Sequence, residues 1–191
     1  AEEVAATFHR LPGIDGRPAW RIPTATARAG NVNGGGDWSR ERLLPDCMRA
    51  FAAGEPAVLR YPSAIRPWQH VLDPLAGYLL LAEDLVAGRP DVPSAVNLGP
   101  DGEATVGEVA GLAAAAWGEG AEVRTDERPG TPPETVTLRL DNGLARDRLA
   151  WRPRWDVADA VTRTVDWHLS LSGGGDMAGV TDAQILEYAG G

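Results

Sequence analysis

The chain has 191 residues, with 18 basic residues against 27 acidic ones and a formal net charge of −9. This length suits one ordinary domain. The acidic balance argues against a general nucleic-acid binder and against a polybasic membrane anchor. The single cysteine, Cys47, excludes an internal disulfide and a multi-cysteine metal site. No apolar run approaches the roughly 20 residues of a membrane span, so we expect a soluble, cytoplasmic protein.

Every one of the 18 basic residues is arginine. The sequence therefore has no lysine for a Schiff base, for a P-loop or for a Tyr-x-x-x-Lys pair. None of these three kinds of lysine chemistry can be carried by residues 1–191.

The first sixty residues alternate loops with short regular elements. Residues 1–9 favour a helix by propensity, and the glycine- and proline-rich residues 11–23 predict a surface loop. Residues 24–28 suit a strand, residues 30–37 form a glycine-rich loop, and residues 57–60 suit a second strand. Between them, apolar residues at i, i+3, i+4 and i+7 predict one apolar helical face, made of Leu44, Cys47, Met48 and Phe51.

Asp73 followed by Pro74 predicts the start of a long helix, with aspartate as N-cap and proline at the first helical position. The apolar residues that follow have helical spacing and end before Gly88. Such a stripe is typical of a helix that faces a core. It consists of Leu75, Tyr78, Leu79, Ala82, Leu85 and Val86.

Capping signals mark the remaining helices, two with the spacing of a capping box and two as single aspartates. They are Thr105 with Glu108, Thr181 with Gln184, Asp141 and Asp156. Strands are expected at residues 94–98, 121–124 and 136–140. Strands that alternate with helices predict an α/β or α+β fold.

The glycine-rich loop at residues 31–37 follows a predicted strand and holds three consecutive glycines. Glycines let a backbone approach a ligand closely, and Asn31 stands at a strand end, where α/β folds place ligand contacts. The loop lacks the Gly-x-Gly-x-x-Gly pattern and a P-loop lysine. It is therefore either a phosphate-binding loop or a flexible turn.

Two arginines, Arg60 and Arg66, lie six residues apart in this acidic chain. Arginine binds phosphate through two parallel N–H donors, so the pair suggests an anionic ligand such as a diphosphate. Pro67 favours an extended conformation for Arg66, which fixes the direction of its side chain. The alternative is that both arginines form ordinary surface salt bridges.

The three histidines, His9, His70 and His168, lack the spacing of metal ligands. His168 and Cys47 each lie on the apolar stripe of a predicted helix. We expect these two to be packing residues rather than ligands.

Several segments together resemble the CDP-glucose 4,6-dehydratases, nucleotide-sugar enzymes of the extended short-chain dehydrogenase/reductase superfamily. The resemblance runs from about residue 27 onward, and two segments are specific: Gly-Gly-Asp-Trp and Arg-Pro-Trp-Gln-His. These two separate the family from the dTDP-glucose dehydratases and UDP-galactose epimerases. Among the matching segments are Ala27-Arg28-Ala29-Gly30-Asn31-Val32, Gly34-Gly35-Gly36-Asp37-Trp38, Arg42-Leu43-Leu44-Pro45-Asp46, Ile65-Arg66-Pro67-Trp68-Gln69-His70-Val71-Leu72-Asp73-Pro74-Leu75, Asn97-Leu98-Gly99-Pro100, Thr105-Val106-Gly107-Glu108 and Trp151-Arg152-Pro153-Arg154-Trp155.

The resemblance implies an α/β fold that combines the C-terminal strands of a Rossmann-like parallel sheet with a smaller mixed α/β substrate-binding domain. Residues 1–191 would form the C-terminal, substrate-binding portion of such an enzyme. The NAD-binding N-terminal portion, which carries the family's catalytic Tyr-x-x-x-Lys pair, would lie outside this sequence. No catalytic residue is therefore expected within it, and the full-length protein is expected to be a homo-oligomer.

The family's reaction converts CDP-glucose to CDP-4-dehydro-6-deoxyglucose with tightly bound NAD. By resemblance, Asn31 would bond the substrate phosphate, Arg66 would pair with the diphosphate, and Gln69 and His70 would orient Arg66. Two further groups are implied. Leu43, Leu44 and Arg60 would line the nucleotide site, and Arg28, Ala29 and Gly30 would border the nicotinamide.

The chain departs from the family's pattern at three places. Asn33 stands where the pattern is apolar, the loop before residue 23 is longer, and residues 133–141 lack two histidines and carry Arg139 in place of a lysine. These departures leave other functions open. The chain could be a non-catalytic nucleotide-sugar-binding module, a decayed paralogue, or part of an NAD-dependent nucleotide-sugar epimerase.

Overall fold

The computed structural model describes residue 3, residues 23–126 and residues 136–190. The predicted loop up to residue 22, residues 133–135, and the predicted N-terminal helix apart from the helical Glu3 lie outside the described residues. The described strands are β1 (Thr26–Ala29), β2 (Asn31–Asn33), β3 (Ala57–Leu59), β4 (Ile65–Arg66), β5 (Trp68–His70), β6 (Ala95–Leu98), β7 (Ala104–Thr105) and β8 (Val123–Thr125). The helices are α2 (Leu43–Ala52), α3 (Leu72–Val86), α4 (Val106–Trp117), α5 (Gly143–Leu149), α6 (Val157–Ser172) and α7 (Met177–Gly190).

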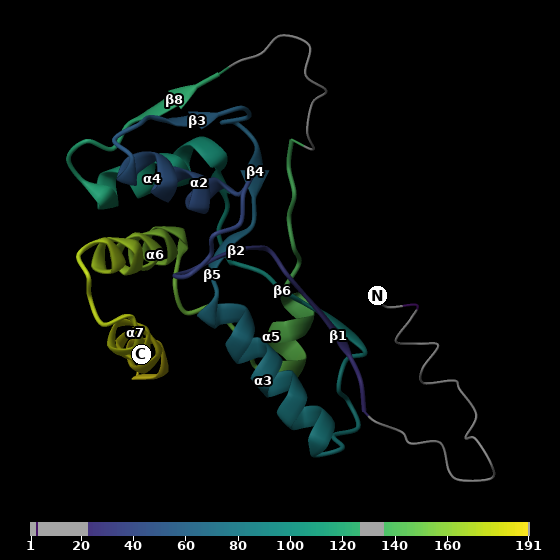
Figure 1. Cartoon of the computed structure of the whole chain (residues 1–191). Helices are drawn as coiled ribbons and strands as arrows, with labels where there is room; N and C mark the ends of the chain where they lie inside the picture. The colour runs from purple at the N-terminus through teal and green to yellow at the C-terminus, as the bar shows by residue number, and fades with distance from the viewer. Residues whose placement is uncertain (1–2, 4–22, 127–135, 191) are drawn as a thin grey trace, which may run out of the picture.

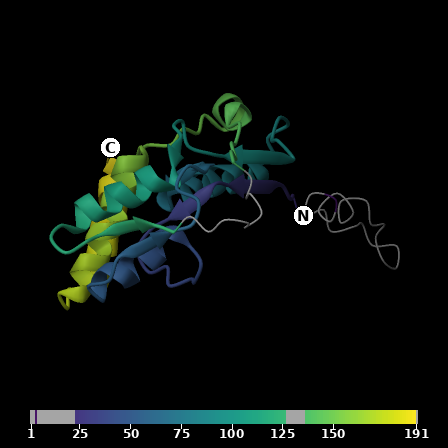
Figure 2. The same cartoon turned by 90° about the horizontal axis from the view of Figure 1, so that it is seen from above.

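The strands pair two by two. β1 pairs in parallel with β6, β2 with β5 and β3 with β8, whereas β4 and β7 are antiparallel. In Figure 1, α2 and α4 lie beside β3 and β8 in the upper part, α3 and α5 lie beside β1 and β6 in the lower part, and β2 and β5 lie between. Figure 2 shows α6 and α7 at one end and β1 at the other. Parallel pairs joined through helices confirm the expected α/β class.

The larger core lies between α2, α4 and α6, and it contains the predicted apolar face of α2. Local capping signals fix where its helices begin. The N–H of Glu108 donates to Thr105 Oγ1 at 3.1 Å and the N–H of Thr105 donates to Glu108 Oε2 at 2.7 Å, which confirms the first capping box. Asp156 caps α6 by accepting the N–H of Asp159 at 2.8 Å.

A smaller core joins β6 to α3 and α5. Its buried members are Leu81, Val96, Leu98, Ala145, Leu149 and Trp151. Gln69 Nε2 donates to the carbonyl of Leu98 at 2.8 Å and so ties β5 to this core. The two cores are thereby linked through the strand that follows Arg66.

The start and the buried face of α3 differ from the prediction. The helix begins at Leu72, and Asp73 does not cap it. Instead, the buried carboxylate of Asp73 accepts the hydroxyl of Tyr188 at 2.9 Å and the N–H of Arg154 at 2.8 Å. The helix buries the face that contains Gly77, where an added Cβ would lie 2.6 Å from Leu98.

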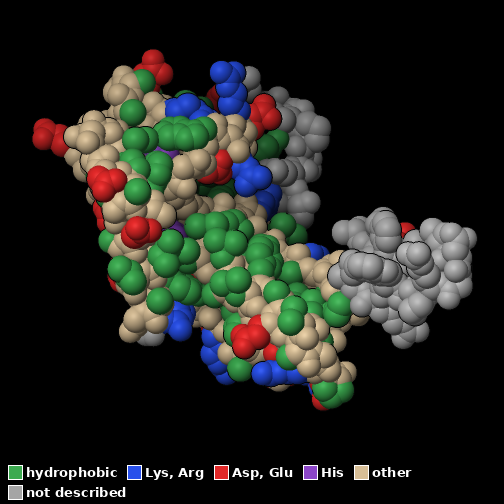
Figure 3. All heavy atoms as spheres, turned by 60° about the horizontal axis from the view of Figure 1, so that its bottom comes forward, with side chains coloured by type: hydrophobic (Ala, Val, Ile, Leu, Met, Phe, Trp, Pro, Cys, Tyr) green, Lys and Arg blue, Asp and Glu red, His purple; other side chains and the backbone are tan. Residues whose placement is uncertain are grey.

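The predicted apolar stripe of α3 is largely exposed. Leu79 is 73% exposed and Val86 is 87% exposed, and Leu75 and Tyr78 are also exposed to solvent. Figure 3 shows apolar side chains gathered over this part of the molecule. Among the described residues, none of the helices has both the length and the apolar content needed to cross a bilayer.

Three further predictions were wrong in detail. Residues 31–33 form strand β2 rather than loop, because the backbone pairs with β5. Residues 136–140 form only one bridge, between Thr137 and Ile65, rather than a strand. Thr181 and Gln184 lie inside α7, where their side chains donate to the carbonyls of Met177 and Arg163, so they form no capping box.

Candidate functional site

Asn31 is placed by the parallel pairing of β2 with β5. Its backbone N–H donates to the carbonyl of Pro67 at 2.8 Å, and Asn31 lies opposite Trp68 in the register. Two residues along, Asn33 is buried, and its Nδ2 donates to Ala160 O at 3.0 Å and to Thr164 Oγ1 at 2.9 Å. Asn33 therefore fastens to α6 the short strand that carries Asn31.

The N-terminus of α2 lies beside this strand. Arg42 is the N-cap and makes no side-chain capping bond. The first N–H groups of a helix have no partner within the helix, and they carry the positive end of its dipole. Here they belong to Leu43 and Leu44, since Pro45 has no N–H. Such a terminus is suited to an anion.

Two cavities share Asn31, Glu41, Leu43 and Trp68 in their walls. The first, which we name the β3 cavity, has a volume of about 250 Å³. The second, the β2 cavity, has a volume of about 290 Å³. The β3 cavity is further lined by Asp46, Cys47, Ala50, Ala57, Val58, Leu59, Arg60, Tyr61, Arg66 and Val106, and the β2 cavity by Gly30, Val32, Asn33, Asp37, Arg42, Leu44 and Pro45.

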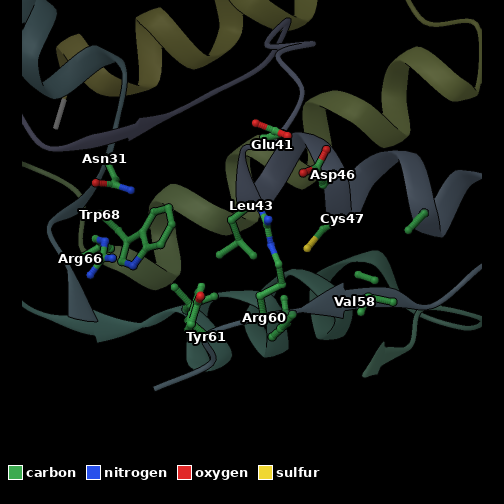
Figure 4. Close-up of a pocket in the computed structure, with 14 residues that line it drawn as sticks. Asn31, Glu41, Leu43, Asp46, Cys47, Val58, Arg60, Tyr61, Arg66 and Trp68 are labelled. Carbon is green, nitrogen blue, oxygen red and sulfur yellow. The ribbon is translucent and has the colours of Figure 1, made fainter. Parts of the chain in front are cut away.

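The two predicted arginines both line the β3 cavity, but in different ways. Arg66 lies on β4, is only 9% exposed, and donates from Nη1 to the carbonyl of Ile65 at 2.9 Å. Arg60 follows β3 and is exposed to solvent. Figure 4 shows Arg66 beside Asn31 and Trp68, and Arg60 extending from the strand toward α2. A guanidinium at a cavity wall can bind an anionic group through two parallel N–H donors.

Acidic side chains surround the entrance to both cavities. Burial raises the pKa of Asp37, but hydrogen bonds from Ser39 and the charges of Arg42 and Arg49 outweigh it and leave this pKa below its ordinary value. Glu41 has a left-handed backbone with φ of 62°, which is rare for a residue with a side chain. Asp46 contacts Arg49. The site thus combines buried donors with carboxylates at its rim.

Gln69 and His70 are buried, but their hydrogen bonds do not go to Arg66. Gln69 donates to Leu98 O, and His70 Nδ1 accepts the N–H of Leu72 at 3.3 Å. The ring of His70 packs on Trp155 with ring centroids 4.7 Å apart. Burial and the charge of Arg163 lower the pKa of His70 to about 4, so its ring is neutral near pH 7. Through these contacts Gln69 and His70 hold β5 to other elements of the fold, whereas the resemblance implied that they would orient Arg66.

The residues expected to border the nicotinamide lie at the end of β1. Arg28 Nε donates to Asn97 Oδ1 at 2.8 Å, Ala29 ends the strand, and Gly30 lines the β2 cavity. An added Cβ at Gly30 would lie 2.2 Å from the carbonyl oxygen of Pro67. Glycine is needed here for the close approach of two backbone segments.

The three consecutive glycines serve packing. An added Cβ at Gly34 would lie 2.7 Å from Val71, and one at Gly35 would lie 2.2 Å from the ring of Trp167. Gly36 has φ of 76°, in the region that glycine favours. Neither the β3 cavity nor the β2 cavity is lined by these three residues. The described contacts therefore favour the turn over the phosphate loop.

The described residues contain no group of three or more His, Cys, Asp or Glu side chains that could hold a metal ion. His168 and Cys47 are buried among packing residues, as predicted. Arg139 and Asp141 line a third cavity of about 320 Å³, where Arg139 pairs with Glu103. The altered segment thus lies apart from the two cavities around Asn31 as far as it is described.

Sequence reasoning missed several lining residues, among them Glu41, Asp46, Tyr61 and Trp68. Asp46 and Trp68 stand inside segments that carry the family resemblance, so their place there was a usable signal. Glu41 gave no signal, because a positive φ at a residue other than glycine cannot be read from one sequence.

Curated proteins of similar sequence cover most of this chain. No family model matches the chain. The CDP-glucose 4,6-dehydratase of Salmonella typhimurium is 38% identical over 169 residues, which are 87% of this chain and 47% of that protein. The chain spans about half the length of the curated relatives it matches.

Solved structures give the same result for the fold. A dTDP-glucose 4,6-dehydratase from Streptomyces venezuelae, solved with NAD, is 26% identical and has a TM-score of 0.69 over 92% of this chain and 50% of that one. A UDP-glucuronic acid 4-epimerase from Bacillus cereus has a TM-score of 0.71 at 14% identity, over 89% of this chain and 50% of that one. In sequence and in fold the chain is therefore similar to about half the length of nucleotide-sugar dehydratases and epimerases of the extended short-chain dehydrogenase/reductase family.

Proposed function

We propose that the chain is the nucleotide-sugar-binding part of an NAD-dependent CDP-glucose 4,6-dehydratase, a lyase that converts CDP-glucose to CDP-4-dehydro-6-deoxyglucose. One observation carries this proposal: Asn31, Arg66 and the N-terminus of α2 meet at two cavities with shared walls. The identity to the Salmonella dehydratase supports cytidine as the nucleoside.

The three groups are donors for a diphosphate. Arg66 supplies a buried guanidinium, Asn31 an amide, and Leu43 and Leu44 the first N–H groups of α2. We assign the nucleoside to the β3 cavity, between α2 and β3, and the sugar to the β2 cavity. The shared walls let one elongated ligand occupy both.

NAD, when bound, supplies the hydride acceptor for oxidation of the sugar. Arg28, Ala29 and Gly30 fit a place at its edge, since they lie at the carboxyl end of a parallel strand, where α/β sheets bind ligands. Gly30 also lines the β2 cavity, so these residues border the proposed sugar site. Arg28 is held by its bond to Asn97.

We assign most of the NAD site to a further part of the protein, outside these residues. Parallel sheets are normally covered on both faces, and a two-stranded sheet is marginal by itself. Among the described strands, β1 pairs only with β6, and the neighbouring helix α3 exposes Leu79 and Val86. An open strand edge and an open apolar face are suited to a further sheet and helix. The chain by itself should then bind substrate without turning it over.

The proposal is tested by titrating CDP-glucose into the full chain by calorimetry. Arg66→Ala should weaken binding by about 2–4 kcal/mol, since it removes a buried charge from the diphosphate. Arg124→Ala is the matched control, because Arg124 is exposed on β8 and pairs only with Glu122 at 2.9 Å among the described ion pairs. A loss of binding free energy within about 0.5 kcal/mol for Arg66→Ala would mean that Arg66 forms an ordinary salt bridge and does not bind the diphosphate.

Turnover gives an independent check. The chain with CDP-glucose and NAD should form no 4-keto product, and formation of that product would contradict the assignment of the catalytic residues to another part. An epimerase is the second candidate, because an epimerase shares the fold at a TM-score of 0.71. Product analysis of the full-length protein separates the two, since only the dehydratase removes water.

A further inference from the structure

Arg60 and Asp46 both line the β3 cavity, on its side away from Arg66 (Figure 4). Arg60 follows strand β3, and Figure 4 shows its side chain extending toward α2, which carries Asp46, while Glu41 lies just before that helix. Arg60 forms no ion pair in the part of the chain that the structure describes. Arg49 contacts Oδ1 of Asp46, which leaves Oδ2 as a second acceptor. The cavity thus has a fork of N–H donors and a carboxylate at one end.

The walls at this end suit a flat ring. Cys47 and Ala50 come from α2, and Ala57 and Val58 come from β3. All four are small or apolar, whereas the opposite end holds Asn31 and Arg66. On the proposed function, with the diphosphate at Asn31 and Arg66, the nucleobase falls at the end where Arg60 and Asp46 lie.

We propose that Arg60 and Asp46 select cytosine over uracil and thymine in the bound nucleotide. Cytosine presents an amino donor at N4 and acceptors at N3 and O2 along one edge. A guanidinium offers two parallel donors and a carboxylate offers an acceptor, so the pair complements all three positions. Uracil and thymine carry an acceptor at O4 and a donor at N3, which oppose the carboxylate and the guanidinium. This inference rests on the proposed function, because it assumes a nucleotide in the β3 cavity.

The test measures the affinities of the full chain for CDP, UDP and dTDP by calorimetry. A matched bidentate contact discriminates between bases by roughly 10- to 100-fold, so CDP should bind tighter than UDP and dTDP by about that factor. Arg60→Gln should bring the ratio of CDP to UDP affinity close to one. Arg60→Lys should do the same while keeping the charge, since ammonium lacks the planar fork. Asp46→Asn should lower the ratio in part.

Arg124→Gln serves as the control, because Arg124 lies on the neighbouring strand β8 and pairs with Glu122. Its ratio should match that of the unchanged chain. All the substituted side chains are at least partly exposed, so circular dichroism should show unchanged folding.

The outcomes separate the two proposals. Equal affinity for CDP, UDP and dTDP would overturn base selection but leave nucleotide binding in place. A preference for CDP that survives Arg60→Gln would overturn the role of Arg60. Failure to bind any of the three would overturn the proposed function and this inference with it.

Discussion

Tyr188→Phe tests the contact that holds the last helix to the rest of the fold. The hydroxyl of Tyr188 donates to Asp73 Oδ1 at 2.9 Å, and Tyr188 is 8% exposed. Phenylalanine keeps the ring, which packs on Trp155 with ring centroids 5.1 Å apart. The substitution therefore removes one buried hydrogen bond and leaves the packing intact.

The expected loss follows from the partner that remains. A hydrogen bond to a charged group contributes about 1.5–3 kcal/mol, and Asp73 Oδ1 still accepts the N–H of Arg154 at 2.8 Å. We expect the free energy of unfolding to fall by about 2 kcal/mol, measured by urea titration with circular dichroism. Tyr78→Phe is the control, since Tyr78 is an exposed tyrosine of α3 and should cost less than about 0.5 kcal/mol. A loss of that small size for Tyr188→Phe would refute the reasoning.

The pH dependence gives a second, sharper check. Burial raises the pKa of Asp73 above its ordinary 3.8, while hydrogen bonds from Arg154 and Tyr188 oppose this. The folded state then binds the proton of Asp73 more tightly than the unfolded state does. The free energy of unfolding therefore falls as pH rises from the ordinary pKa of 3.8 through the higher pKa of the folded state. Loss of the hydroxyl raises the pKa further. The effect of Tyr188→Phe should therefore be largest at neutral pH and shrink as pH falls toward 4. A constant effect would contradict the role of an ionised Asp73.

Three further outcomes are expected. Gly35→Ala should lower the free energy of unfolding by about 1–3 kcal/mol, because the new Cβ would lie 2.2 Å from the Trp167 ring. Gly111→Ala should raise the free energy of unfolding, because Gly111 lies on α4 with open space around it. Thermal melts that give both changes the same sign would contradict this. Burial raises the pKa of Cys47 to about 12, so iodoacetamide at pH 8 should label it only after unfolding in urea, and rapid labelling of the native chain would contradict its burial. Burial lowers the pKa of His70 to about 4. The stability that the neutral His70 ring contributes is therefore complete above pH 6.5 and should be lost as pH falls toward 4. An NMR titration of the ring with a midpoint near 6.5 would contradict the effect of burial.

Local signals predicted the fold where one short segment decides the structure. The capping box at Thr105 and the cap at Asp156 are set by residues three apart, so they are visible in the sequence. α3 was different, because apolar residues occur on more than one of its faces. Gly77 packs on Leu98, and this contact, which joins distant parts of the chain, decides which face is buried. Periodicity identified the helix but could not assign its partner.

The candidate site was predictable residue by residue but not in its arrangement. Asn31, Arg60 and Arg66 were identified from their chemistry and from family resemblance, and all three line the β3 cavity. The roles of Gln69 and His70 were not foreseeable in this way, since their hydrogen bonds depend on how β5 lies against β6 and α3. Short-range pattern pointed to side chains that line this cavity, whereas tertiary contacts decide which residues lie beside them.

The fastening of β2 to α6 through Asn33 has a consequence for local unfolding. Asn33 Nδ2 bonds two acceptors on α6, Ala160 O and Thr164 Oγ1. If α6 opens, β2 loses these bonds and Asn31 loses its fixed place. The amide hydrogens of β2 and of the first turns of α6 should then exchange with solvent as one cooperative unit. A ligand that holds Asn31 would slow exchange on a helix it does not touch.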